Sequence, residues 1–136
     1  MFEAMVKSAT TATLAKKLNA DLDLKFTAIF AKMLEDKLAP LTAISQFSIR
    51  EIANTIYVQF AKPIPGSTIS PSISITVEHH REGGAFIDIV IYHGPLTVRH
   101  PSNNYELTRA NADEVLDRVL SSRKGELEKM IERWVG

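Results

Sequence analysis

The sequence contains no cysteine. This excludes disulfide bonds, catalytic thiolates, cysteine-ligated zinc and iron–sulfur clusters. Because small secreted domains often depend on disulfides, the absence favours a reducing compartment, and we expect a cytoplasmic protein. The sequence also has no run of about 18 apolar residues, so it predicts no membrane span. Residues 1–20 lack the pattern of a signal peptide.

The sequence has no excess of charge of either sign. Sixteen Lys and Arg residues balance sixteen Asp and Glu residues among 136. Nucleic-acid-binding domains usually carry a basic excess, so we do not expect a nucleic-acid partner. The 45% of hydrophobic and 24% of charged residues are typical of a globular protein. We therefore expect one domain, residues 1–136.

The N-terminal third of the chain has the apolar spacing of helices. A first helix is predicted from a stripe that begins at Phe2 and ends near Asn19, and a second from an N-cap at Asp21 to a stop before Pro40. The apolar face of the second helix is expected to pack in the core. It consists of Leu22, Phe26, Ile29, Phe30, Met33 and Leu34.

Apolar and polar residues alternate in five segments of the middle region, which predicts five strands with one buried face. The separating segments are short and rich in Gly and Pro, which indicates antiparallel neighbours. The apolar positions are Phe47 and Ile49; Ile56, Val58 and Phe60; Ile73, Ile75 and Val77; Ile87, Ile89 and Ile91; and Leu96 and Val98.

The C-terminal region again has helical periodicity. Asn111 and Glu114 have the spacing of a capping box, which predicts a helix start. Ser121, Ser122 and Gly125 leave two readings open, a single kinked helix or two helices. Trp134 is expected to dock on the core in preference to forming a dimer contact.

These elements predict an α+β fold. N-terminal helices precede a five-stranded antiparallel β-meander, and a C-terminal helix or kinked helix pair packs on the same sheet face. If the meander pairs by its shortest turns, Thr76 lies opposite Asp88, Glu78 opposite Phe86, Asp88 opposite Arg99, and Ser48 opposite Tyr57.

The other sheet face is expected to remain uncovered, and we call it the outer face. Its predicted members are Ser48, Tyr57, Gln59, Ser72, Ser74, Thr76, Glu78, Phe86, Asp88, Val90, Tyr92, Thr97 and Arg99. The simplest interpretation is a solvated surface with one Asp88–Arg99 ion pair. The functional interpretation is a contact surface, because Tyr, Phe and Arg are enriched at interface centres.

We therefore expect a non-catalytic interaction module, a homodimer or a small component or inhibitor of a larger assembly. The residues expected to carry the interaction are Tyr57, Thr76, Phe86, Asp88, Tyr92 and Arg99.

Two alternatives remain open. One is a site for a small anionic ligand or nucleotide formed by Arg81, Arg99 and Arg109. The other is a hydrolase or metal enzyme that uses His79 or His80 with Glu78 and His100. Adjacent strand residues point to opposite faces, so the paired histidines rarely serve one ion. We expect polar turn histidines in solvent, no catalytic residues, no metal and no cofactor.

Overall fold

The computed structural model describes residues 1–80, 82–94 and 103–136. Its first element, α1 (Phe2–Lys37), is one continuous helix, so the prediction of two helices is wrong. Asn19 does not end a helix and Asp21 does not begin one. The sequence has no proline or glycine before Pro40, so nothing in this stretch interrupts the helix. Pro40 lies in η1 (Ala39–Ala43), after α1 has ended as expected.

Five antiparallel strands follow in the spatial order β1-β2-β3-β4-β5. They are β1 (Phe47–Ile52), β2 (Thr55–Phe60), β3 (Ser72–His79), β4 (Ala85–Tyr92) and β5 (Asn103–Tyr105). Four predicted strands are confirmed. The predicted strand at Leu96 and Val98 lies outside the described residues. The strand that pairs with β4 is Asn103–Tyr105, which the sequence analysis did not predict.

The predicted register is correct between β3 and β4, where Thr76 lies opposite Asp88 and Glu78 opposite Phe86. It is wrong between β1 and β2, because Ser48 lies opposite Gln59, while Tyr57 lies opposite Arg50. A shift of two residues leaves every side chain on its own face, so alternation cannot detect the error. The turn at Ala53 and Asn54 sets the true register.

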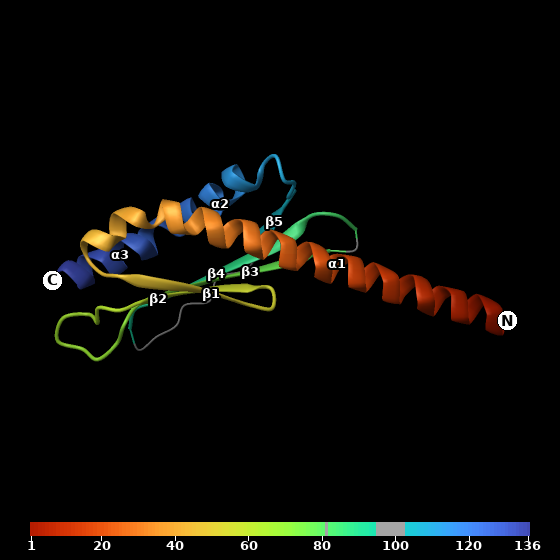
Figure 1. The fold of residues 1–136 in the computed structure, drawn as a ribbon, viewed down its shortest axis with the longest axis horizontal. Helices are drawn as coiled ribbons and strands as arrows, with labels where there is room; N and C mark the ends of the chain where they lie inside the picture. Colours follow the sequence, from red (N-terminus) through yellow and green to blue (C-terminus); the bar gives the residue numbers. More distant parts are fainter. Residues whose placement is uncertain (81, 95–102) are drawn as a thin grey trace.

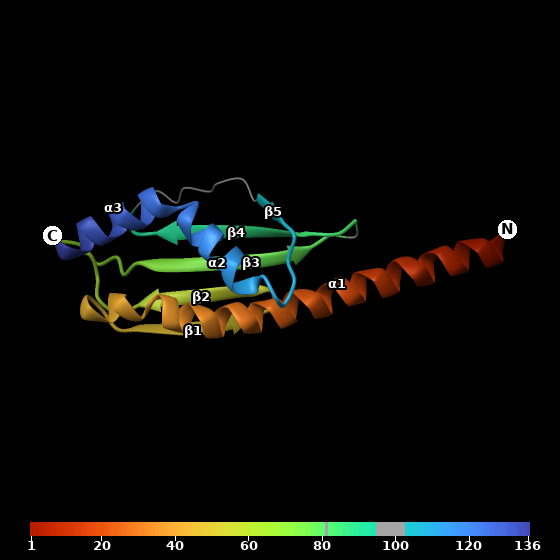
Figure 2. The same cartoon turned by 90° about the horizontal axis from the view of Figure 1, so that it is seen from above.

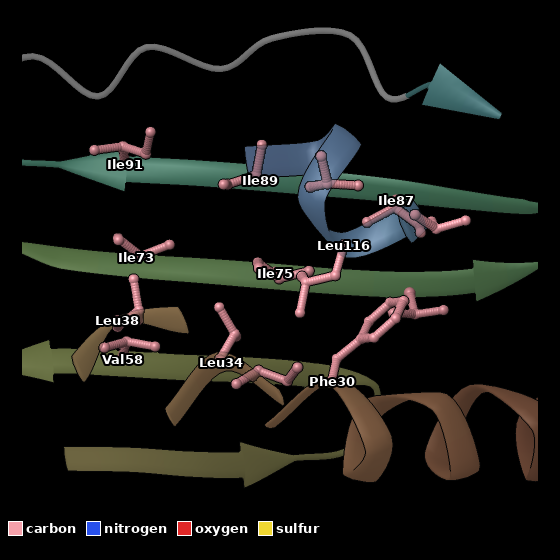
Figure 3. Packing of buried hydrophobic residues seen from close by; sticks show 14 of the residues in the cluster. Phe30, Leu34, Leu38, Val58, Ile73, Ile75, Ile87, Ile89, Ile91 and Leu116 are labelled. Carbon is pink, nitrogen blue, oxygen red and sulfur yellow. The ribbon is translucent and has the colours of Figure 1, made fainter. Parts of the chain in front are cut away.

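The three helices lie on one face of the sheet, and α1 continues well past the end of it (Figure 1). Seen from above, α1 runs along β1 and β2, while α2 (Ala112–Ser121) and α3 (Lys124–Val135) lie over β3 and β4 (Figure 2). The core lies between these two layers. Phe30 and Leu34 of α1, Leu38 directly after it and Leu116 of α2 pack on the strand residues Val58, Ile73, Ile75, Ile87, Ile89 and Ile91 (Figure 3).

The C-terminal region forms two helices, separated at Ser122 and Arg123. Asn111 precedes α2 as expected, but the predicted capping box is absent. The side-chain oxygen of Asn111 instead accepts the backbone N–H of Thr108 at 2.7 Å. Trp134 docks on the core as predicted. Its side chain is fully buried against Phe60, with ring centres 4.7 Å apart. Its indole N–H donates to the Lys62 carbonyl at 2.9 Å.

Candidate interaction surfaces

The outer face is the surface of β1–β4 opposite the helices. It exists because every second residue of these strands, most often Ile or Val, is buried in the core, so the intervening residues point away from it. No described helix covers this side of the sheet (Figure 1). Its described members are Ser48, Arg50, Ile52, Thr55, Tyr57, Gln59, Ser72, Ser74, Thr76, Glu78, Phe86, Asp88, Val90 and Tyr92.

Two aromatic side chains of the outer face are well exposed, Tyr57 at 41% and Phe86 at 36%. Thr76, Asp88 and Tyr92 are half-buried. The structure therefore brings five of the six predicted interaction residues onto one surface. Arg99, the sixth, lies outside the described residues, as does its expected pairing with Asp88.

The charges of the described outer face are unevenly placed. Arg50 lies on β1 and is exposed, whereas Glu78 and Asp88 lie on β3 and β4 across the sheet. Arg50 was not among the predicted members of the outer face, because the first strand was expected to end near Ile49. Continued alternation from Ser48 was the signal that would have found it. The face is thus basic at one side and acidic at the other.

An open hollow of about 370 Å³ lies beside Phe86 at the end of the sheet, lined by His80, Glu82, Gly83, Phe86 and Asn104. The His80 ring stands edge-on to Phe86 with ring centres 3.6 Å apart. The carboxylate of Glu82 in the lining disfavours an anionic ligand, so this hollow gives no support to the predicted anion site.

His79 is not a solvated turn residue, so that expectation is wrong. It is the last residue of β3, and its side chain is only 9% exposed. One carboxylate oxygen of Asp23 in α1 accepts both the backbone N–H and the ring Nδ1–H of His79, each at 2.6 Å. The ring also packs on Phe26. This link fixes α1 to the sheet at the point where the helix leaves it.

His93 is also bound to protein rather than solvated. Arg133 of α3 donates to its carbonyl oxygen at 2.6 Å and to its ring Nδ1 at 3.0 Å. Glu126 lies 3.7 Å from the other ring nitrogen. The histidine therefore joins the end of β4 to α3.

The structure does not assemble the predicted catalytic or ligand sites from the residues it describes. Arg81, Arg99 and His100 lie outside those residues, and Arg109 is exposed after β5. Glu78 and His79 are on opposite sheet faces. Within residues 1–80, 82–94 and 103–136, no three His, Asp or Glu side chains are grouped to hold a metal ion.

The second uncovered surface is the part of α1 that extends beyond the sheet, residues 2–22, which we call the arm (Figure 2). Its residues are exposed except for Ala15 and Asn19, which are half-buried. The arm presents several large apolar side chains to solvent: Phe2, Met5, Val6, Leu14, Leu18 and Leu22. The helical spacing of this segment was predicted, but no function was predicted for it.

The described helices include none that is apolar over enough of its length to span a membrane.

Comparisons with protein-family models, with curated proteins and with solved structures gave no match to this chain.

Proposed function

We propose that the protein is a protein–protein interaction module that associates with a second copy of itself through the outer face. The observation that supports this most directly is the exposure of Tyr57 and Phe86 on a sheet face that no described helix covers. Large aromatic side chains on such a surface are the usual anchors of protein interfaces.

The charge distribution favours a second copy as the partner. A two-fold axis parallel to the strands, between β2 and β3, lays β1 of one copy over β4 of the other. Arg50 of each copy then lies beside Asp88 of the other, because Arg50 shares a cross-strand row with Val90, two residues from Asp88. The basic side of each outer face then lies against the acidic side of the other, in one symmetric contact.

The large and small side chains of the two outer faces also fit together in this arrangement. Tyr57 on β2 lies in the same row as Ser74 on β3, so the axis places each tyrosine over the serine of the second copy. Two sheets that pack face to face need such interdigitation of large and small side chains across a gap of about 10 Å. The central Ser and Thr residues of the outer face supply the small positions.

The test measures the molar mass in solution against protein concentration by light scattering. Tyr57→Ser and Phe86→Ser should each weaken association by about 2 kcal/mol, as expected for interface anchors. Val135→Ser, which changes an exposed apolar residue on α3, is the matched control and should leave association unchanged.

Charge exchange tests the geometry itself. Arg50→Glu should weaken association, and the double variant Arg50→Glu with Asp88→Arg should restore it. If Tyr57→Ser and Phe86→Ser associate like the unmodified protein, the outer face is not the interface. If the two variants still self-associate but no longer bind a different protein, the partner of the outer face is that protein and not a second copy.

A further inference from the structure

We propose that the arm is a second, separate interface, and that it pairs antiparallel with the arm of another copy, centred on Thr10. This surface shares no residue with the outer face. It would join copies at the opposite part of the molecule, where α1 has left the sheet (Figure 2).

The arm is a long helix without tertiary support. An isolated helix of about this length is marginal in water, because most helical stability in proteins comes from packing. Threonine residues weaken it further. Val6 is 67% and Leu14 57% exposed, so the side chains that would supply the packing have no partner in the described chain. The arm therefore needs a companion helix.

The middle of the arm has the shape that a companion helix requires. A shallow, open apolar depression there is lined by Val6, Ala9, Thr10, Thr13 and Leu14. The first four have the spacing of the hole that receives one side chain in helix pairing. Thr10 and Thr13 donate their hydroxyls to the carbonyls of Val6 and Ala9 at 2.8 and 2.9 Å. Their hydroxyl hydrogens are thus used inside the helix.

Four of the large apolar side chains of the arm are placed symmetrically about Thr10. In an antiparallel pair centred there, each residue lies level with the one equally far beyond Thr10 in the other copy. Val6 then lies level with Leu14, and Phe2 with Leu18. The small residues Ala9, Thr10 and Thr11 occupy the centre, where two helices approach most closely.

The charges identify the occupant as a second copy in this register. Glu3 lies level with Lys17 of the other arm, and both are on the same side of the helix as Thr10 at 3.6 residues per turn. Residues 8–15 carry no charge at all. The pairing thus has an uncharged centre and one complementary ion pair at each end, which is the usual arrangement of interface core and rim.

Cysteine cross-linking tests the register, because the natural chain contains no cysteine. Helices 8–10 Å apart bring facing Cα atoms within the range of a disulfide. Thr10→Cys should therefore oxidise to a covalent dimer. Met5→Cys, which is similarly exposed but lies on another side of the helix, should remain monomeric on a denaturing gel. Equal cross-linking of the two variants, or none of Thr10→Cys, would overturn the proposal.

A charge exchange and a packing change test the contacts. Glu3→Lys should weaken association about two- to fivefold, and adding Lys17→Glu should restore it. Val6→Ala with Leu14→Ala preserves helix propensity and should weaken association at least about tenfold, whereas Met5→Ala should not. These variants leave Tyr57 and Phe86 intact, so failure here is distinguishable from failure of the outer face. Unchanged association in all of them, or binding of the arm to anionic lipid vesicles in its place, would contradict the arm pairing.

Discussion

The carboxylate of Asp23 accepts two hydrogen bonds from His79, one from the backbone and one from the ring. Both donors are shielded from water, so no solvent molecule replaces the carboxylate easily when it is removed. The His79 Nε2 atom is already without a hydrogen-bond partner in the described structure. Without the Asp23 carboxylate, neither ring nitrogen of His79 would have a hydrogen-bond partner in the described structure.

Asp23→Ala should therefore lower the free energy of unfolding by about 1–3 kcal/mol, the cost of buried donors left unsatisfied. Asp21→Ala is the matched control, because it makes the same change in the same helix at an exposed position. Urea unfolding of the two variants measures the difference. Equal midpoints would mean that the Asp23–His79 link contributes nothing to stability.

At the scale of elements, α1 and α2 are joined by one lysine and two aspartates. Lys37 lies 2.8 Å from Asp113 and 2.7 Å from Asp117. The hydrogen bonds that the Lys37 ammonium donates to Asp113 and then Asp117 raise the pKa of Lys37 above its ordinary value of 10.5. The ammonium is thus favoured in the folded state, and its stabilisation is complete below pH 10.5 and lost as the pH rises through the raised value.

Lys37→Gln should cost at most about 1 kcal/mol near neutral pH, because both aspartates are largely exposed. The difference from the unmodified protein should shrink as the pH rises above 10.5. Lys32→Gln, an exposed position on the same helix, is the control. Urea unfolding across this pH range measures both, and a difference that grows with pH would contradict the assignment.

The elements also show what the sequence can predict. Alternation placed Ile73, Ile75, Ile87 and Ile89 correctly in the core, because the pattern reports which face is buried. It could not fix the β1–β2 register, since pairings two residues apart bury the same faces. The turn that decides it contains Ala53 in a left-handed conformation (φ 52°), which is uncommon for alanine and is not predictable from its type.

The candidate site was predicted only in part, for a related reason. The aromatics of the outer face follow from local alternation, so Tyr57 and Phe86 were found. The Asp23–His79 link joins residues 56 positions apart, so no local sequence pattern predicts it. Asp21, whose type and position suggested a helix cap, has no such role because the helix continues through it.

At the scale of the whole molecule, the two proposed two-fold contacts together predict assemblies larger than a dimer. Light scattering of the unmodified protein at high concentration should give a mass above that of two chains. Phe86→Ser, or Val6→Ala with Leu14→Ala, should each reduce this to a dimer, and all three changes together should give a monomer. If the unmodified protein is instead a single dimeric species, and one of the two sets of changes alone converts it to monomers, only one contact exists.

The overhang of α1 also sets a distance. Its C-terminal half is held by the sheet and by Asp23, and its helix has no proline or glycine at which to bend. Thr10 precedes Asp23 by enough residues to span about 20 Å along the axis at 1.5 Å per residue. Two copies paired at Thr10 would keep their sheets roughly 40 Å apart. The length of the helix would then set the distance between any partners bound to the two sheets.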